Sequence, residues 1–218
     1  MKKLITIIGA GKGISQSIAK KFGNEGFKIA LIARNESNLQ ELVMQLSKLG
    51  IDATYAVADV SNEESLKKAL FQIKENEGHS EVIVYNAAAV SVMDILEQNW
   101  ETIKSEMEVN VGGYFNLMKT VLPYCIKESK GKLFVTNGGF ALGGDPQWTS
   151  LSVGKAALRN LVQAFQKKVD GSNIHIAQVT VCGFVNENDE KYNPKAIAEN
   201  YWNLYQQTEG NFEGEIIY

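Results

Sequence analysis

The sequence predicts a single α/β domain, a doubly wound parallel sheet of about seven strands with helices on both faces. Short apolar runs alternate along the chain with segments whose apolar residues recur at helical spacing. The runs are apolar at nearly every position, which is typical of parallel strands buried on both faces. The 218 residues, 44% of them hydrophobic, suffice for one sizeable core and contain no linker or repeat.

Each element follows from this rhythm. The expected strands are, in chain order, 4–8, 28–33, 53–57, 82–85, 132–136, 174–181 and 215–218. The expected helices run from about 14 to 25, 37 to 49, 61 to 73, 100 to 126, 150 to 169 and 194 to 205. Ser37 with Gln40 and Ser61 with Glu64 fit the capping box that starts a helix. Pro123 is expected to kink or shorten the end of the long helix.

Composition disfavours several classes of function. The net charge is −3 and no basic stripe with interleaved aromatic residues is present, which argues against nucleic acid as a partner. No apolar run approaches the ~18 residues of a membrane span, and a strand so close to the first residue leaves no room for a signal peptide. Cys125 and Cys182 form no disulfide framework, which suits the cytoplasm. His79 and His175, both expected at the surface or an edge, are too few and too distant for a metal site.

A glycine-rich stretch separates the first strand from the first helix: Gly9-Ala10-Gly11-Lys12-Gly13-Ile14-Ser15. In nucleotide-binding domains, such glycines let the backbone approach a pyrophosphate, which lies on the N–H groups and positive dipole of the following helix. A plain strand-to-helix turn is the alternative. Arg34, Asp59 and the segments 86–88 and 137–139 follow other strands. Because the carboxyl ends of parallel strands share one edge, these residues favour a nucleotide site.

The end of the second strand predicts which nucleotide binds. An acidic side chain there would bond the ribose 2′-hydroxyl of NAD, whereas an arginine accommodates the 2′-phosphate of NADP. The chain has Ala33-Arg34 at this point, and Lys12 supplies a second cation. We therefore expect NADP(H) to be preferred over NAD(H). The alternative is that both cations are solvated loop residues.

Together, these motifs resemble the short-chain dehydrogenase/reductase family along essentially the whole chain. The other matching motifs are Asp59-Val60 (the family's adenine-contacting pair), Asn86-Ala87-Ala88 (its Asn-Ala-Gly), Asn110-Val111-Gly112-Gly113 (its Asn-Val-x-Gly) and Gly183-Phe184-Val185 (its Pro-Gly-x-Val, with Cys182 for proline). The resemblance implies a Rossmann-like NAD(P)-binding domain over residues 1–218, with strand order 3-2-1-4-5-6-7. It also implies a homodimer or homotetramer formed through the two long helices.

The expected cofactor contacts come from these motifs and the two cations. They are Gly9, Gly11, Lys12, Gly13, Ile14, Arg34, Asp59, Val60, Asn86, Ala87, Ala88, Lys155, Phe184 and Val185.

The resemblance also implies a reaction, but two of its residues are missing. Family members use a tyrosine as acid or base, a lysine four residues later, a serine about thirteen residues before the tyrosine, and an asparagine that anchors a water relay. Lys155 and Asn110 match the lysine and the asparagine, so they are the candidate catalytic residues. The tyrosine position holds Leu151 and the serine position holds Gly138. A general acid or base contributes ~10²–10⁴ in rate, and an oxyanion partner a similar factor, so carbonyl reduction is expected to be weak or absent.

Two functions stay open at this point. One is an NADP(H)-dependent oxidoreductase for an unknown carbonyl or alcohol, with its proton supplied by water on Lys155 and Asn110 or by an unidentified hydroxyl. Tyr192 and Tyr201 are candidates to fold over the pocket, although a structural role is the alternative for each. The other function is a catalytically silent dinucleotide-binding protein with a sensing or assembly role. A long-chain relative acting on nucleotide sugars or on protein partners ranks last, because no extra substrate domain is expected after the last strand.

Phe140 and Trp148 are expected near the pocket, either as a substrate wall or as part of the core.

Overall fold

Seven parallel strands form one sheet in the order β3-β2-β1-β4-β5-β6-β7, as the sequence predicted. The structure is a computed structural model that describes residues 2–218. The strands are β1 (Leu4–Ile8), β2 (Lys28–Ala33), β3 (Ala53–Val57), β4 (Val82–Tyr85), β5 (Gly131–Gly138), β6 (Ile174–Val181) and β7 (Glu215–Ile217). Ile8 pairs with both Ile32 and Tyr85, so β1, β2 and β4 end side by side. The strand order reverses between β1 and β4, which is where ligands bind in sheets of this kind.

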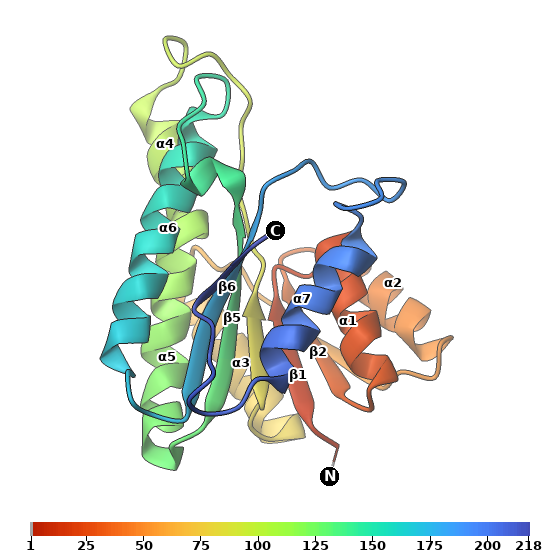
Figure 1. The fold of residues 1–218 in the computed structure, drawn as a ribbon. Coiled ribbons are helices and arrows are strands. Elements are labelled where there is room, and N and C mark those ends of the chain that lie inside the picture. The colour runs from red at the N-terminus through yellow and green to blue at the C-terminus, as the bar shows by residue number, and fades with distance from the viewer. Residues whose placement is uncertain (1) are drawn as a thin grey trace.

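Helices cover both faces of the sheet (Figure 1). One face carries α1 (Ile14–Asn24), α2 (Glu36–Ser47) and α7 (Pro194–Gln206), whose apolar residues share a core cluster with Ile5 and Ile7 of β1. The other face carries α3 (Glu63–Glu77), α5 (Gly113–Glu128) and α6 (Thr149–Lys168), which pack on Leu4 and Ile8. Alternate residues of β1 therefore pack into two separate hydrophobic cores, one on each face of the sheet, as the continuous apolar strands predicted.

The long helix expected at 100–126 is divided. It consists of α4 (Trp100–Met107), a π-helical turn η1 (Glu108–Gly112) and α5. Within the turn, the carbonyl of Val109 accepts a 2.5 Å hydrogen bond from the hydroxyl of Tyr85. Pro123 lies inside α5, which continues to Glu128, so of the two predicted effects of the proline, a kink or a shortened end, the shortening was wrong. Leu122 and Cys125 are buried, and this packing holds the last turn in place.

Asparagine side chains, and not the predicted serines, cap four helices. The Oδ1 atoms of Asn35, Asn62, Asn99 and Asn193 accept the first-turn N–H groups of α2, α3, α4 and α7. Ser37 lies inside α2, and the hydroxyl of Ser61 donates to Asp59, so both predicted capping boxes were wrong. By contrast, α1 and α6 begin without a side-chain cap.

His175 is not at the surface, contrary to the prediction. It is 1% exposed, stacks on the ring of Phe212 and pairs through Nε2 with the carbonyl of Glu213. The Phe212–Gly214 segment before β7 covers it. No helix within residues 2–218 is long and apolar enough to span a bilayer.

Candidate functional site

Glycine stands at three positions of the turn after β1, and the structure explains each position differently. Gly9 has a φ of 80°, and a Cβ there would lie 2.3 Å from the backbone nitrogen of Ala87. Gly13 has a φ of 87° at the start of α1. Both positions therefore require glycine for the chain itself. Gly11 has an unstrained φ, and a Cβ there would meet nothing within 4 Å. The fold leaves the space beside Gly11 open for something other than protein.

The start of α1 has the properties of an anion site. Its N-cap, Gly13, offers no side chain to the first-turn N–H groups. Ser15, which takes the place of the family's last glycine, is buried and secures the turn from inside. Its hydroxyl accepts from the N–H of Gly11 at 2.8 Å and donates to the carbonyl of Gly11 at 2.9 Å. The helix dipole and the uncapped N–H groups together favour a negative group at this end.

A cleft of about 320 Å³ continues from the turn across the ends of the strands. Its lining consists of Gly9, Ala10, Ala33, Arg34, Asn35, Ala58, Val60, Asn86, Ala87, Ala88 and Val109. The structure thus brings together at one cleft six of the predicted residues, Gly9, Arg34, Val60, Asn86, Ala87 and Ala88, whereas Gly11, Gly13, Ile14 and Asp59 do not line it. Lys12 is not in this lining. Its exposed ammonium lies 3.7 Å from the carboxylate of Glu41 on α2.

Asp59 stands beside this cleft with its carboxylate held in place. Its Oδ1 accepts from the hydroxyl of Ser61 at 2.7 Å and from the backbone N–H of Ser61 at 3.0 Å. The hydrogen bond from the Ser61 hydroxyl does most to lower the pKa of Asp59. Burial opposes it, and the backbone N–H of Ser61 and the charge of Arg34 each lower the pKa by a smaller amount. Arg34 itself is exposed, so its guanidinium is accessible to a ligand.

A chain of hydrogen bonds ties the glycine turn to β5 and to α7, which packs beside α1 on the same face of the sheet. The side-chain amide of Asn86 donates to the carbonyl of Gly9 at 3.3 Å, and its Oδ1 accepts from the hydroxyl of Thr136 at 2.7 Å. The hydroxyls of Thr136 and Tyr201 lie 2.6 Å apart. Asn86 therefore fixes the turn relative to β5 and α7. The fully buried Tyr201 is an anchor for this chain and not a residue that folds over the pocket.

Lys155 and Asn110 are both buried near the end of β5. The ammonium of Lys155 donates to the carbonyl of Thr136 at 3.0 Å, and burial lowers its pKa to about 8. Asn110 lies in η1, where its amide forms a pair of 2.9 Å hydrogen bonds with the N–H and carbonyl of Ala89. Gly154 lets α6 approach closely, since a Cβ there would lie 3.0 Å from the amide nitrogen of Asn110. The two residues are held rigidly by neighbouring backbone.

Leu151 and Gly138 lie where the sequence placed them, on α6 and at the end of β5. Leu151 is half-buried one turn before Lys155. Gly138 has an extended backbone, and a Cβ there would lie no closer than 3.9 Å to protein, at the carbonyl of Val181. The flanking hydroxyls are already engaged. Ser150 donates to the buried carboxylate of Glu106, and Ser152 accepts from the N–H of Asp145.

Tyr192 packs against the backbone of Gly183, where a Cβ would lie 2.3 Å from its ring. It also meets Tyr218 edge to face. Its position gives it a structural role in the segment after β6.

Three aromatic rings line up at the carboxyl edge of the sheet. Phe140 and Trp148 stack with centroids 5.5 Å apart, and Phe184 lies 6.2 Å from Trp148. Phe140 and Trp148 are half-buried, whereas Phe184 is 74% exposed. Val185 beside it is also exposed. These rings form an exposed wall and not a core cluster.

Sequence reasoning missed two buried pairs that support this region. One is the hydrogen bond between Ser150 and Glu106, and the other joins the amide of Asn137 to Gln178 at 2.9 Å. The first pair had a usable signal. Glu106 lies four residues before Asn110, and Ser150 lies four before Gly154, so the spacing would have pointed to this pair once the contact between Asn110 and Gly154 was known from the structure.

The fold and the glycine turn define the class of protein, a Rossmann-like α/β domain with a ligand cleft at its switch point. Comparison with known proteins agrees. A family model described as short chain dehydrogenase matches residues 3–196. An uncharacterised oxidoreductase of Staphylococcus epidermidis is 28% identical over 181 residues, which cover 82% of this chain and 76% of that protein.

Two solved structures are similar in fold. A short-chain dehydrogenase from Rhodopseudomonas palustris superposes with a TM-score of 0.87 at 26% identity, covering 98% of this chain and 96% of the other. An alcohol dehydrogenase from Thermococcus sibiricus, complexed with 5-hydroxy-NADP, gives 0.89 at 24% identity, covering 100% and 96%. The chain belongs to the short-chain dehydrogenase family.

Proposed function

We propose that this chain is an NADP(H)-dependent oxidoreductase for a carbonyl or alcohol substrate, with an intact cofactor site and weakened proton transfer. One observation carries the proposal. One cleft joins Gly9 and Ala10 of the glycine turn to Arg34, with no carboxylate at the end of β2, and the turn continues from there past the open space at Gly11 into the uncapped start of α1. The family to which the chain belongs supports the reaction class.

The residues at the cleft fit a dinucleotide. The turn from Gly9 to Ile14 would hold the pyrophosphate on backbone N–H groups. Arg34 would pair with the 2′-phosphate, and Lys12 is within reach of the same side once it exchanges Glu41 for the ligand. When bound, the nicotinamide supplies or accepts the hydride.

The adenine and nicotinamide ends have separate supports. Asp59 and Val60 would contact the adenine, and Asn86, Ala87 and Ala88 the adjoining ribose. Lys155 would hold the nicotinamide ribose, with Phe184 and Val185 beside the ring.

Proton transfer is where the chain departs from its family. Leu151 has no proton to give, and Gly138 offers no hydroxyl to a carbonyl oxygen. The ammonium of Lys155, with a pKa near 8, keeps a proton at neutral pH in a dry environment. We propose that water held by Lys155 donates the proton, which makes turnover slow.

Calorimetric titration with NADPH and NADH tests the cofactor assignment. We expect NADPH to bind at least about tenfold more tightly, since a charge-assisted pair with the 2′-phosphate contributes ~1.5–3 kcal/mol. Arg34→Gln should remove most of this preference, while Lys48→Gln on the far end of α2 should leave it unchanged. Equal binding of the two cofactors by the parent protein would refute the preference.

NADPH oxidation with a panel of ketones, aldehydes and quinones tests the activity. Turnover above the substrate-free background supports an oxidoreductase. Tight NADPH binding without turnover on any substrate would instead indicate a silent dinucleotide-binding protein.

We also propose that the chain forms a homodimer or homotetramer through α5 and α6. The support is an apolar groove of about 540 Å³ between these helices, at which Phe115 and Ile126 are exposed. Light scattering on the purified protein should give a multiple of the 24.1 kDa chain mass, and Phe115→Asp should reduce it.

A further inference from the structure

A second cavity, of about 340 Å³, lies between α3 and α5. It opens at the amino ends of the strands, where the loop from Gly78 to Ser80 enters β4, whereas the glycine turn lies at the opposite edge of the sheet. Its size is within the ~300–1,000 Å³ of small-molecule sites. None of the residues assigned above to the cofactor or the reaction lines it.

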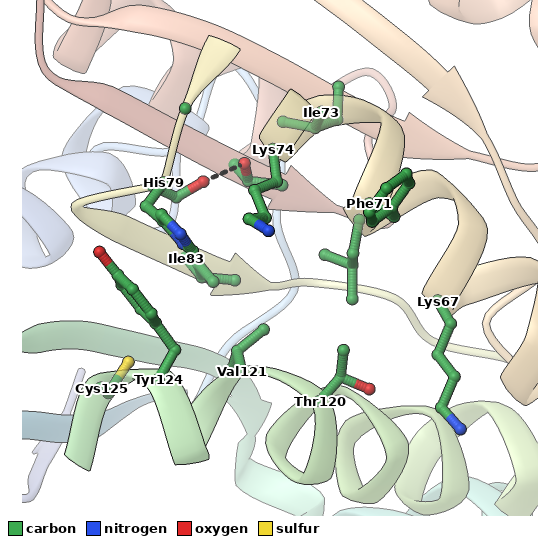
Figure 2. Close-up of a pocket in the computed structure, with 14 residues that line it drawn as sticks. Lys67, Phe71, Ile73, Lys74, His79, Ile83, Thr120, Val121, Tyr124 and Cys125 are labelled. Atoms are coloured by element: carbon green, nitrogen blue, oxygen red, sulfur yellow. Dashed lines mark hydrogen bonds between the residues drawn. The ribbon is translucent and has the colours of Figure 1, made fainter. Parts of the chain in front are cut away.

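The walls of this cavity are mostly apolar (Figure 2). Phe71 and Ile73 come from α3, Ile83 from β4 and Val121 from α5. Phe71 is 60% exposed, although it is a large aromatic residue at the entrance to an apolar space. An apolar ligand would cover this ring and gain the free energy of removing it from water.

One wall of the cavity is a stacked pair of aromatic rings, called the plate below. His79 and Tyr124 stack with centroids 3.5 Å apart and planes 2° apart, and Figure 2 shows them side by side at the edge of the cavity. The plate joins the loop before β4 to the last turns of α5. It therefore gives the cavity a fixed side, suited to a slender ligand.

The polar groups that face the cavity are mainly hydrogen-bond donors and cations. Lys67 and Lys74 extend from α3 along its rim in Figure 2. Their carboxylate partners are neighbours on the same helix, Glu63 at 2.8 Å and Glu75 at 3.5 Å. Such exposed pairs are weak and exchange readily for a ligand anion.

The floor supplies one more donor. The hydroxyls of Thr6 and Ser80 lie 2.7 Å apart, and Thr6 is 1% exposed. Two hydroxyls carry two protons, but their mutual hydrogen bond uses only one. The hydrogen bonds found within residues 2–218 give the other proton no acceptor.

We infer that this cavity binds an amphipathic monocarboxylate, a medium-length acyl chain with one anionic head. The acyl chain lies along the apolar walls under Phe71, and the carboxylate lies at the rim, where the ammonium groups of Lys67 and Lys74 supply positive charge. A neutral or cationic ligand of the same length lacks the complementary charge. This site is independent of the proposed reaction.

Decanoate, used below its micelle-forming concentration, is the probe. Methyl NMR should show saturable shifts at Ile73, Ile83 and Val121, and none at Ile14 or Val185 of the cofactor cleft. Calorimetry should give one site per chain. Affinity should rise two- to fourfold per methylene from hexanoate to decanoate, and decanol should bind about tenfold more weakly than decanoate.

Two surface variants, each with a matched control, locate the site. Phe71→Ala should weaken decanoate binding about tenfold, whereas Met44→Ala, an equally exposed apolar residue on α2, should not change it. Lys67→Gln with Lys74→Gln should weaken decanoate about tenfold and leave decanol unchanged, whereas Lys48→Gln should do neither.

Three binding results would overturn the inference. They are the absence of saturable decanoate binding, decanoate shifts confined to the cofactor cleft, and equal binding by the parent and Phe71→Ala. A fall in the solution mass of the unliganded protein on Phe71→Ala would also overturn it, because the face would then be an interface between copies of the chain.

Discussion

Two regions at the carboxyl edge of the sheet differ in whether their polar groups are open to a ligand or bonded to protein. In the binding half, formed by the turn 9–15 and the ends of β2, β3 and β4, the space at Gly11, the start of α1 and the guanidinium of Arg34 are available to a ligand. In the reaction half, formed by η1, the end of β5 and the start of α6, the polar side chains bond to protein. Lys155 is bonded to Thr136 and Asn110 to Ala89.

The difference teaches what each half is built to do. A ligand site keeps donors uncommitted, because a donor that already has a protein partner must exchange it before it can bind anything else. In the reaction half, the amide of Asn110 and one of the three N–H donors of Lys155 already have backbone partners, and positions 138 and 151 carry no hydroxyl. We therefore expect cofactor binding to be strong relative to catalysis, and the following experiments can break or sharpen that contrast.

Restoring the missing hydroxyls should produce the largest effect. Gly138→Ser fits without strain, because the backbone is extended and a Cβ has free space. Leu151→Tyr places a phenol one helical turn before Lys155. The double variant should reduce carbonyl substrates ~10²–10⁴-fold faster than the parent, as a positioned acid contributes, measured by NADPH oxidation.

The matched control is Leu151→Phe with Gly138→Ala, which has similar bulk and no hydroxyl. It should show no gain. If the tyrosine and serine variant binds NADPH but gains nothing either, the reaction half differs from its family by more than two side chains.

Within the binding half, two glycines should separate stability from ligand binding. Gly9→Ala forces a side chain into the backbone of Ala87 at a φ of 80°, so it should lower the free energy of unfolding by about 3–5 kcal/mol. Gly11→Ala meets no protein atom and should change it by less than ~0.5 kcal/mol. Urea titration measures both.

Gly11→Ala should nonetheless weaken NADPH binding at least about tenfold, if the pyrophosphate occupies the open space. Unchanged NADPH affinity in this variant would show that the cofactor does not approach the turn there.

The buried ammonium of Lys155, in the reaction half, should make the free energy of unfolding depend on pH. The pKa of Lys155 is lowered by burial to about 8 in the folded protein from 10.5. Below pH 8 both states are protonated and folding bears the full cost of the buried charge, at most about 3 kcal/mol. Between pH 8 and 10.5 only the unfolded state keeps the proton, so the stability of the parent rises with pH.

Lys155→Met removes this pH dependence in the cofactor-free protein. Relative to the parent, the variant should therefore be most stable at pH 7 and lose that advantage by pH 10.5. The hydrogen bond lost at Thr136 adds a constant cost at every pH. If the difference in free energy of unfolding between the parent and Lys155→Met stayed constant from pH 7 to 10.5, Lys155 would be solvated in the folded protein.

The fold could be predicted largely from sequence because its signals are local and repeated. Continuous apolar strands and periodic helices predicted the order of elements along the chain, right-handed crossovers predicted a doubly wound sheet, and the family resemblance supplied the strand order. The cofactor cleft followed, since Gly9, Arg34 and Asn86 each come directly after a strand and parallel strands end together.

What sequence could not supply depends on contacts between distant segments. The π-helical turn at η1 includes a carbonyl bonded to Tyr85, twenty-four residues earlier. The helix caps depended on which residue adopts an extended backbone at the boundary, and Asn35 does so just before α2 while Ser37 is already helical. The engagement of Lys155 with Thr136 and the role of Tyr201 are likewise visible only after packing.

The smallest expected effect belongs to Asp59, the titratable carboxylate of the binding half. Its pKa is lowered in the folded state by hydrogen bonds from Ser61, so it stabilises the fold above its unfolded pKa, and that contribution is lost as pH falls through the folded pKa. Because the group is partly exposed and screened by solvent, Asp59→Asn should cost only a few tenths of a kcal/mol at pH 7 and nothing near pH 2. Urea titrations of both proteins at the two pH values measure the difference. A cost comparable to the effect of Lys155, persisting at pH 2, would show that the binding half is as internally committed as the reaction half, and the contrast between them would fail.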